Sequence, residues 1–544
     1  MANKRSTTNL AQKLLRAFLQ HSSTSTNTST STSSRKTNAH STNSKFSHKC
    51  YKTKVIDVEG CLLKSCSTFP YFMVVALEAG GGGLLRGLLL LLSYPFICLL
   101  GNEIGFKFMV MLTFCGLRKE SLVRVGRAIL PKHLLEDVSL QGFEMLKKME
   151  NGHGRVICVS RMPRVMIEAF LREYLEVEYV LGRELKVLGG FYTGFMQGGE
   201  EGEKVLELKE VLKDCSYEIS ASAFVGFSSS TFVKSQFPLS SYCKEILLVD
   251  KEEKKRWQAS PRERYPKPLI FHDGRLAFRP TPLNTLFMFL WLPLGFILAL
   301  LRLTVSLSLP YKLSTPVLAM TNMKWRLLGS GEKTITISEY QYHHSKTTNK
   351  RGRLFVCNHR TLIDPIYISV AINRPVHAVS YSLSRVSEIL SPISTVRLTR
   401  NRNKDATIMG QLLDRGESVV VCPEGTTCRE PYLLRFSPLF TELSDEVVPV
   451  AVNVRTSMFY ATTAGGWKCF DPLYYLMNPS MCYEVQFLEK IDTSDVKVRW
   501  YSSTDMANQV QHEIGKALGF KCTMLTRKDK YMMLAGNDGI VGKS

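Results

Sequence analysis

The sequence predicts a two-domain α/β protein that associates with a membrane. Strand-like and helix-like patterns alternate along much of the chain, long apolar stretches interrupt them, and 544 residues exceed the size of one ordinary domain. With 44% hydrophobic and 22% charged residues, the chain is able to bury sizeable cores. We therefore expect an α/β domain on each side of a central apolar segment.

The chain carries an excess of positive charge, since 70 Lys and Arg against 48 Asp and Glu give a formal charge of +22. This excess favours an acidic membrane surface or a phosphorylated substrate, although it also suits a solubilising surface. Nucleic acid is not an expected partner, because no zinc spacing, RNP-like motif or arginine-rich tract occurs. The 14 cysteines include no CxxC pair and many lie in apolar runs, which predicts reduced, buried thiols without zinc or disulfides.

Residues 1–48 are rich in Ser, Thr and Asn, and no acidic residue precedes Asp57. Within them, residues 9–19 have apolar positions at helical spacing on a basic background. This composition is typical of a basic disordered tail or of an organelle transit peptide, and both interpretations stay open. A secretory signal is not expected, because no uninterrupted apolar core lies near the start.

The first domain is expected over residues 49–279. Residues 55–61 predict a buried strand that ends in an acidic loop, and residues 155–160 predict another buried strand. Between them, region 84–117 holds two apolar runs too short to span a bilayer securely, so it is expected to form a membrane-surface hairpin or a buried helical cap. Helical patterns follow over residues 168–178 and 200–213.

A central apolar segment, residues 280–322, separates the two domains. It includes 22 consecutive uncharged residues and is the best membrane candidate, but Pro293 leaves a spanning helix and a bent hairpin both open. The second domain is expected over residues 323–525, followed by a tail over residues 526–544. Its expected elements are strands at 354–357, 418–422 and 447–454, and a helix from Asp364.

The candidate catalytic residues are His359 and Asp364, in the stretch Asn358-His-Arg-Thr-Leu-Ile-Asp364. The histidine follows a strand, and the aspartate lies five positions later at an expected helix start, so its carboxylate can return to the imidazole. It would fix the tautomer of the ring and raise its basicity, and His359 could then take the proton of a substrate hydroxyl. Taken alone, the pair is also typical of a structural helix cap.

Two later segments carry residue types that bind phosphate. Residues 423–430, Pro-Glu-Gly-Thr-Thr-Cys-Arg-Glu, follow a strand and combine a glycine, hydroxyls and Arg429. Residues 395–402 form a basic loop that contains Arg400, for which a solvated charge cluster is the alternative interpretation. A final apolar strand around Pro449 is expected to belong to the core.

These four blocks, spread over residues 350–455, resemble the glycerolipid acyltransferase family, whose blocks include Asn-His, four residues, Asp, and later Pro-Glu-Gly-Thr. Thr427 and Cys428 depart from the broader Pro-Glu-Gly-Thr-Arg-Ser pattern, and Arg429 is expected to replace the displaced arginine. The wider chain resembles the land-plant glycerol-3-phosphate acyltransferases of the cutin and suberin type, through Phe69-Pro-Tyr-Phe72, Pro268-Leu-Ile-Phe-His-Asp-Gly-Arg275 and residues 423–431.

The resemblance implies transfer of an acyl group from acyl-coenzyme A to glycerol 3-phosphate, at the sn-2 position, giving lysophosphatidate without a metal or other cofactor. His359 would act as general base, oriented by Asp364. The resemblance also implies a lipid membrane as partner. This is the endoplasmic reticulum membrane with the catalytic domain on its cytosolic face, or alternatively the mitochondrion. A lysophospholipid acyltransferase and a non-catalytic membrane scaffold are the alternatives. The acceptor would be bound by Asn358, Arg400, Glu424, Gly425, Thr426 and Arg429.

In the same plant group the first half resembles the haloacid-dehalogenase phosphatases, which combine a Rossmann-like domain with the motif Asp-x-Asp-x-Thr. Here the motif is Asp57-Val-Glu59-Gly-Cys61, and Ser160 corresponds to the hydroxyl of the second motif. Residues 225–232 contain no acid where the family's Mg²⁺-binding pair is expected. The expectation is a haloacid-dehalogenase-like domain with a vestigial, metal-free phosphatase site, so a membrane-bound phosphatase is disfavoured.

Overall fold

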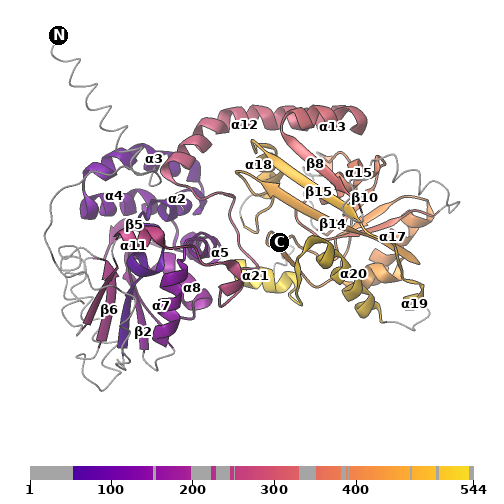
Figure 1. The fold of residues 1–544 in the computed structure, drawn as a ribbon. Helices are drawn as coiled ribbons and strands as arrows, with labels where there is room; N and C mark the ends of the chain where they lie inside the picture. The colour runs from indigo at the N-terminus through magenta and orange to yellow at the C-terminus, as the bar shows by residue number, and fades with distance from the viewer. Residues whose placement is uncertain are drawn as a thin grey trace, which may run out of the picture. The chain divides into compact units, whose positions relative to one another are not determined.

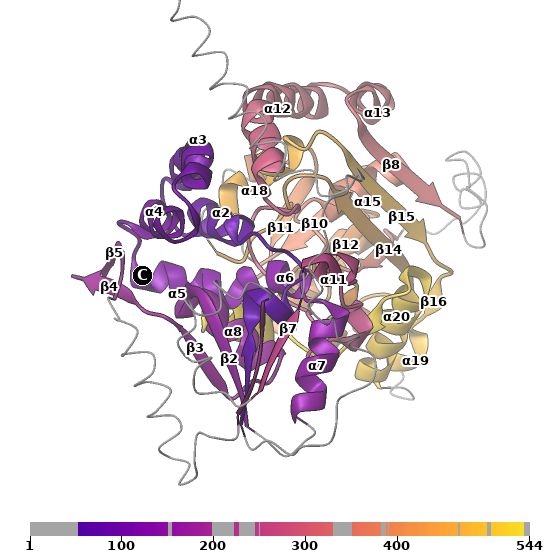
Figure 2. The ribbon, with the colours of Figure 1, turned by 60° about the vertical axis from the view of Figure 1, so that its left-hand side comes forward.

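The chain folds into two compact units, each with its own β-sheet (Figure 1, Figure 2). Unit 1 contains the chain up to Pro268 together with Arg279–Leu286, and unit 2 contains Leu269–Phe278 together with the chain from Phe287. The expectations for residues 1–48 and for a helix over 200–213 lie outside the described residues. The computed structural model describes residues 53–150, 155–197, 222–227, 245–249, 251–329, 351–381, 388–389, 391–465, 468–497 and 502–537.

Unit 1 is built on a five-stranded parallel sheet in the order β3-β2-β1-β6-β7. Both β1 and β2 are rich in buried apolar residues, as expected for parallel strands that are covered on both faces. The strand predicted at 55–61 is shorter than expected, because a π-helix, η1 (Val58–Leu62), follows directly after Asp57. The strands are β1 (Thr53–Asp57), β2 (Arg155–Pro163), β3 (Tyr179–Arg183), β6 (Ser222–Phe227) and β7 (Glu245–Val249).

The region predicted as a membrane-surface hairpin or a buried helical cap is a pair of helices, α3 (Gly83–Leu99) and α4 (Asn102–Phe114), which pack on each other and on α2 (Phe69–Glu78). One side of α3 exposes leucines to solvent, among them Leu85, Leu92 and Leu99. The helix predicted at 168–178 is α8 (Arg164–Tyr174), which starts and ends four residues earlier. The other elements of unit 1 are α5 (Lys119–Ala128), α6 (Leu130–Leu135), α7 (Leu140–Glu150), β4 (Leu185–Leu188), β5 (Phe191–Met196), α11 (Lys251–Arg256) and η4 (Arg262–Arg264).

Unit 2 is built on a larger sheet in the order β11-β10-β12-β9-β14-β15-β8, with β16 beside β14. The five strands from β11 to β14 are parallel to one another, whereas β15 is antiparallel to β14. The strands predicted at 354–357, 418–422 and 447–454 are found as β9, β12 and β14. The strands are β8 (Met323–Leu328), β9 (Leu354–Cys357), β10 (His377–Ser380), β11 (Ser394–Arg397), β12 (Val419–Val421), β14 (Glu446–Thr456), β15 (Met481–Phe487) and β16 (Ile491–Asp492).

Side-chain alternation along β9 divides the core of unit 2 between two faces of the sheet. Phe355 and Cys357 belong to one apolar cluster with α15 (Asp364–Ile372), while Leu354 and Val356 belong to the other, with α17 (Arg402–Asp414) and α20 (Ser503–Leu518). Figure 2 shows α20 beside β14, against which it packs. The remaining elements are β13 (Tyr432–Leu433), η5 (Pro438–Glu442), η6 (Lys468–Phe470), α18 (Asp471–Leu476), α19 (Ser494–Lys497) and β17 (Lys521–Cys522).

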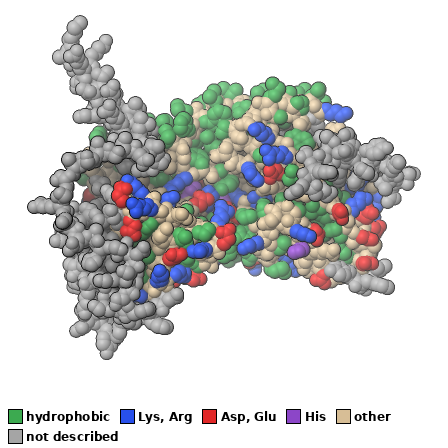
Figure 3. Space-filling model, in the orientation of Figure 1, with side chains coloured by type: hydrophobic (Ala, Val, Ile, Leu, Met, Phe, Trp, Pro, Cys, Tyr) green, Lys and Arg blue, Asp and Glu red, His purple; other side chains and the backbone are tan. Residues whose placement is uncertain are grey.

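Helix α12 (Pro282–Ser308) runs without interruption through Pro293 and is followed by α13 (Tyr311–Met320). Its best window has a mean hydropathy of 2.2, so by length and composition it is able to cross a membrane. Figure 3 shows apolar side chains gathered along it. A bent hairpin is therefore not the form found here, because one proline kinks a helix without necessarily ending it.

The tail predicted over residues 526–544 begins with a folded helix, α21 (Arg527–Ala535). Thr526 and Asp529 form a reciprocal capping box at its start, and Gly536, with φ +69°, ends it. These signals are visible in the sequence, so the tail interpretation was wrong for residues 526–537.

The segment Leu269–Phe278 packs with unit 2, although the sequence places the domain boundary at residue 279. His272 Nε2 lies 2.9 Å from Glu430 Oε1, and Arg275 donates to Asp471 at 2.8 Å. Asp273 accepts the backbone N–H groups of residues 464 and 465. These long-range pairs, which no local pattern reveals, hold the segment on the later unit.

Candidate active site

The loops that carry the predicted residues meet at one edge of the unit 2 sheet. Strands β9 and β12 are parallel neighbours, so the loops that follow them leave the sheet side by side. The backbone N–H of His359 donates to Glu424 Oε1 at 2.7 Å, and the N–H of Cys428 donates to the carbonyl of His359 at 2.8 Å. The two sequence blocks are thus directly bonded to each other.

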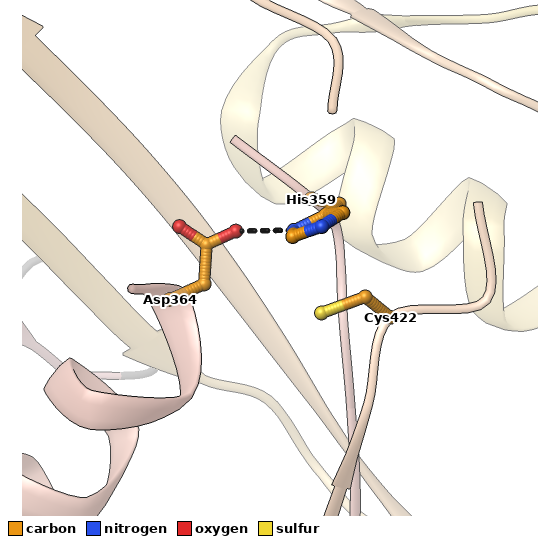
Figure 4. Close-up of side chains that lie close together, drawn as sticks. All are labelled: His359, Asp364 and Cys422. Atoms are coloured by element: carbon orange, nitrogen blue, oxygen red, sulfur yellow. Dashed lines mark hydrogen bonds and ion pairs between the residues drawn. The ribbon is translucent and has the colours of Figure 1, made fainter. Parts of the chain in front are cut away.

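His359 and Asp364 form a hydrogen-bonded pair (Figure 4), in which His359 Nδ1 lies 2.9 Å from Asp364 Oδ2. Asp364 is completely buried, and the imidazole retains partial exposure to solvent. Because the carboxylate accepts from Nδ1, the proton of the neutral ring resides on Nδ1 and the lone pair on Nε2. The arrangement leaves Nε2 available to accept a proton.

Asp364 closes the loop before α15 and does not cap that helix, whose N-cap is Ile363. Its Oδ2 also accepts the N–H groups of Arg360 at 2.7 Å and Thr361 at 3.0 Å. Its Oδ1 accepts the hydroxyl of Thr361 at 2.8 Å and the hydroxyl of Tyr483 from β15. The carboxylate is therefore held in place from several directions, and the helix-cap interpretation does not apply.

Glu424 links the loops that follow β9 and β12 to the body of unit 2. Its Oε2 accepts the N–H of Leu434 at 2.9 Å, in addition to the His359 N–H on Oε1. Burial raises the pKa of this carboxyl to about 7, against the lowering effect of the two backbone donors. Since each oxygen accepts a backbone N–H, Glu424 ties the loop at His359 to the segment at Leu434.

Cys422 lies beside His359, and reactive atoms of Cys422, His359 and Asp364 lie within 4.8 Å of one another (Figure 4). Burial acts to lower the pKa of His359, but the charge of a Cys422 thiolate and the bond to Asp364 raise that pKa well above its usual value. The oxygens of Asp364 are filled by N–H and O–H donors. The three side chains therefore form one hydrogen-bonded network.

Asn358, Gly425 and Thr426 adjoin this centre in different ways. The Asn358 amide is fully buried and bonds to both backbone groups of Val452, at 2.9 and 2.8 Å, so it fastens the loop to β14. Gly425, with φ +66°, is exposed at the tip of the turn, where a side chain would be strained. The Thr426 hydroxyl accepts from Lys530 Nζ of α21 at 3.3 Å.

The two predicted arginines lie in different surroundings. Arg429 is largely buried, stacks on Tyr460 at 4.4 Å and lies 3.9 Å from Asp273, so it helps to hold the 269–278 segment. Arg400 is exposed in the loop after β11, and no ion pair of Arg400 is found among the described residues. Two strands separate β11 from β9, which puts the start of that loop roughly 14 Å from His359 along the sheet edge.

In unit 1, the residues of the phosphatase-like motif meet at the carboxyl end of β1. The Ser160 hydroxyl donates to Glu59 Oε1 at 2.5 Å, and the same oxygen accepts the N–H groups of Arg161 and Met162. Burial, with the neighbouring charge of Glu59, raises the pKa of Asp57 to about 8. Lys254 of α11 donates to the backbone carbonyl of Glu59 at 2.5 Å.

Sequence reasoning missed three contributors to the acyltransferase-like site: Cys422, Lys530 and Tyr483. Cys422 precedes the Pro-Glu-Gly-Thr block and was interpreted only as a buried thiol. Lys530 is buried under the turn at Thr426 and Thr427, and the capping box at Thr526 was the available signal for its helix. Tyr483 carries no local signal, because β15 reaches Asp364 only through the fold.

The two units correspond to two known domain families. Residues 53–249 match the model of the haloacid-dehalogenase-like domain of glycerol-3-phosphate acyltransferases similar to RAM2, and residues 337–453 match the acyltransferase model. The fold and site thus define an α/β acyltransferase joined to a haloacid-dehalogenase-like domain.

Comparison with individual proteins specifies the family further. The chain is 50% identical over 500 residues to probable glycerol-3-phosphate acyltransferase 2 of Arabidopsis thaliana, covering 90% of each chain. It is 44% identical to glycerol-3-phosphate acyltransferase 1 of the same plant, covering 89% of this chain and 81% of that one. It is 40% identical to the glycerol-3-phosphate acyltransferase RAM2 of Petunia hybrida, covering 89% and 97%. The chain belongs to this family of plant glycerol-3-phosphate acyltransferases.

Solved structures give partial likenesses of fold only. One is the acyltransferase PlsC of Thermotoga maritima, at 14% identity and a TM-score of 0.25, covering 39% of this chain and 76% of that one. Another is a phosphoserine phosphatase, at 17% identity and a TM-score of 0.25, covering 37% and 96%.

Proposed function

We propose that the protein transfers an acyl group from acyl-coenzyme A to the sn-2 hydroxyl of glycerol 3-phosphate and releases lysophosphatidate. The observation that carries this proposal is the His359–Asp364 pair, held at the sheet edge beside the Pro423–Thr426 turn. Family membership supports the reaction, and the pair supports the chemistry by which the acceptor is activated.

In this mechanism His359 Nε2 accepts the proton of the acceptor hydroxyl as its oxygen forms a bond to the thioester carbon. Asp364 stabilises the imidazolium that results. The carbon–sulfur bond then breaks, and the leaving coenzyme A thiolate takes the proton back from the ring. The same imidazole accepts and returns the proton, and no covalent enzyme intermediate is formed.

The acceptor phosphate is assigned to Arg400 and to the exposed turn at Gly425, with the Thr426 hydroxyl behind it. Arg400 extends from the same sheet edge and is exposed, and the N–H groups of a glycine turn bind anions. Asn358 and Glu424 are left out of the substrate contacts, because their polar atoms bond to backbone groups within unit 2. Arg429 is left out because it is largely buried between Tyr460 and Asp273.

An apolar pocket of about 120 Å³ in unit 2 supports a fatty acyl donor. It is lined mostly by apolar side chains of α12, α13, β8 and α15, including Leu303, Leu318 and Trp325. It also contacts Ile363, which directly precedes Asp364 in the chain. An acyl chain in this pocket would therefore have its thioester end close to the proposed base.

The test is an assay of purified protein with labelled glycerol 3-phosphate and acyl-coenzyme A, followed by separation of the lipids and regiochemical analysis. His359→Ala is expected to lower kcat by about 10²–10⁴-fold, the usual contribution of a positioned base. His377→Ala is a matched control. His377 is the first residue of β10 and pairs at 2.8 Å with Glu417, which lies just before the neighbouring strand β12, so this pair lies at the end of the sheet opposite to His359. An active His359→Ala protein would refute the mechanism, and preference for a lysophospholipid acceptor would refute the substrate.

We further propose that unit 1 has no phosphatase activity. The Glu59 carboxylate accepts hydrogen bonds from the Ser160 hydroxyl and from two backbone N–H groups. A phosphoryl group in this site would need donors of the same type. A negative charge in that position repels phosphate. Magnesium-dependent release of phosphate from glycerol 3-phosphate or lysophosphatidate by the purified protein would overturn this proposal.

For membrane association, we propose that α12 lies in the cytosolic surface of the endoplasmic reticulum membrane. One face of α12 is fixed to unit 2, since Trp291 donates to the carbonyl of Met477 at 2.7 Å and Arg302 donates to the carbonyls of Leu476 and Asn478. The opposite face exposes a row of apolar side chains at helical spacing: Leu290, Leu294, Ile297 and Leu301.

A helix with one face docked on a folded unit and the other face apolar suits an in-plane position better than a bilayer crossing. Tags at the two ends of the chain are then expected on the same, cytosolic side of sealed microsomes, both open to protease. Protection of one tag only would establish a crossing and refute the in-plane position. Localisation to mitochondria would refute the compartment.

A further inference from the structure

The molecule holds a pair of cysteines that form and break no bond in the proposed acyl transfer. Cys357 is the last residue of β9, and Cys422 directly follows β12. The two strands are paired up to Val356 and Val421, so the next residues of each, the two cysteines, stand opposite each other. Their sulfur atoms lie 3.4 Å apart.

The two thiols have opposite characters. The hydrogen bond from Cys357 lowers the pKa of Cys422 to about 6, with support from the charge of His359 and against the effect of burial. The pKa of Cys357 is raised well above its usual value by the same contact and by burial. Cys422 is partly exposed, while Cys357 is buried. One sulfur is therefore an accessible nucleophile, and the other is a protected thiol beside it.

Other buried cysteines of the described chain lack this environment. Burial raises the pKa of Cys158 on β2, and burial also raises the pKa of Cys428 to about 12. A thiolate that is accessible and adjacent to a second thiol is the arrangement on which reversible oxidation depends.

We propose that Cys422 is a site of oxidation by peroxides, that Cys357 is its resolving cysteine, and that the resulting disulfide suppresses acyl transfer. The Cys422 thiolate attacks one oxygen of hydrogen peroxide, which gives a sulfenic acid and one water after protonation. The Cys357 thiol then attacks that sulfur, and the hydroxyl leaves as a second water. Two thiols and one peroxide thus give one disulfide and two waters.

The disulfide requires little movement of the chain. Neighbouring strands lie about 4.8 Å apart, within the range of Cα separations that disulfides span, and the sulfurs must approach by about 1.4 Å to reach bonding distance. Side-chain rotation supplies a shift of this size. A thiol reductant reverses the bond by exchange, so the pair is compatible with a reducing compartment.

The consequence for the site follows from its position, and this step depends on the proposed function. His359 lies two residues after Cys357, and Glu424, which accepts the His359 N–H, lies two residues after Cys422. The disulfide joins the ends of the two strands from which both residues project and removes the thiolate that faces the imidazole. His359 is then displaced from the position that proton transfer requires, which must be kept to a fraction of an ångström.

The test treats the purified full-length protein with hydrogen peroxide, removes the excess, and measures acyltransferase activity before and after dithiothreitol. Peptide mass spectrometry follows the Cys357–Cys422 link in the same samples. The parent is expected to lose at least about tenfold in activity as the link forms and to recover it on reduction. Cys158→Ala, which changes a buried cysteine of unit 1, is expected to respond as the parent does.

In Cys357→Ala, Cys422 is expected to stop at the sulfenic acid, which dimedone traps, and no linked peptide forms. Full activity in a parent sample that is quantitatively linked would overturn the proposal. Loss of activity in the parent without the link would overturn it as well. Formation of the link in a protein that has no acyltransferase activity at all would instead refute the proposed function and leave the cysteine chemistry standing.

Discussion

The substitution Asp364→Asn separates the catalytic role of Asp364 from its structural role. The Asp364 carboxylate accepts N–H donors of His359, Arg360 and Thr361 at Oδ2, and the hydroxyls of Thr361 and Tyr483 at Oδ1. An asparagine with its oxygen in the Oδ2 position retains the three N–H bonds. Its NH₂ group then faces two hydroxyls, which are able to accept as well as donate. The network therefore survives, and the charge is lost.

The size of the two effects can be worked from these contacts. Each of the three N–H bonds changes from a charged to a neutral acceptor, which costs about 1 kcal/mol, so the free energy of unfolding falls by at most about 3 kcal/mol. Catalysis loses the charge that stabilises the imidazolium. We expect kcat to fall by about 10²–10⁴-fold, equivalent to about 3–5 kcal/mol, with little change in KM for glycerol 3-phosphate.

The assay measures initial rates with glycerol 3-phosphate and acyl-coenzyme A, together with thermal denaturation of the same preparations. Glu417→Gln is the matched control, since it changes the carboxylate that pairs with His377 at 2.8 Å, and a partly exposed pair of this kind contributes little. A folded Asp364→Asn protein with kcat within about threefold of the parent would refute the assignment of Asp364, because no orienting charge would then be needed.

Three further predictions concern the surroundings of this pair. Burial lowers the pKa of His359, but the Cys422 thiolate and Asp364 raise it well above its usual value. Because the base is active only when neutral, kcat/KM is expected to fall as the pH drops through that raised pKa. Cys422→Ser should move this acid limb of the pH profile to lower pH, and an unmoved limb would contradict the reasoning. Lys530→Met leaves the Thr427 carbonyl without a buried donor and should lower the free energy of unfolding by about 1–3 kcal/mol in denaturant titrations, while Lys528→Met, on an exposed position of α21, should not. Arg400→Ala should raise KM for glycerol 3-phosphate about tenfold with kcat nearly unchanged, and an unchanged KM would remove Arg400 from the phosphate site.

Much of the architecture was predictable because its signals are local. The buried strand at 354–357, the helix from Asp364 and the strand at 447–454 each have an apolar pattern of the right length, and each is found where expected. The hairpin in region 84–117 follows from two apolar runs around a polar link. The predicted end of the second domain, residue 525, lies before the folded helix α21, although the capping box of this helix is visible in the sequence.

The roles of individual site residues were less predictable, because they depend on which backbone groups come close. Asn358 and Glu424 belong to the right blocks, but their polar atoms bond to Val452, His359 and Leu434 and so position loops. Arg429 stacks on Tyr460 and lies 3.9 Å from Asp273. In each case the partner lies on an element remote in sequence.

The sequence by itself determined the family, the two α/β domains and the histidine–aspartate pair, because residue types at short spacing fix which backbone turns and which chemistry are available. Only the tertiary structure decided that Tyr483 and Lys530 reach this centre and that Cys357 and Cys422 stand opposite each other. Parallel strands bring residues 65 positions apart into register, and hydrogen bonds and sulfur contacts depend on distances of a few ångströms that spacing along the chain does not specify.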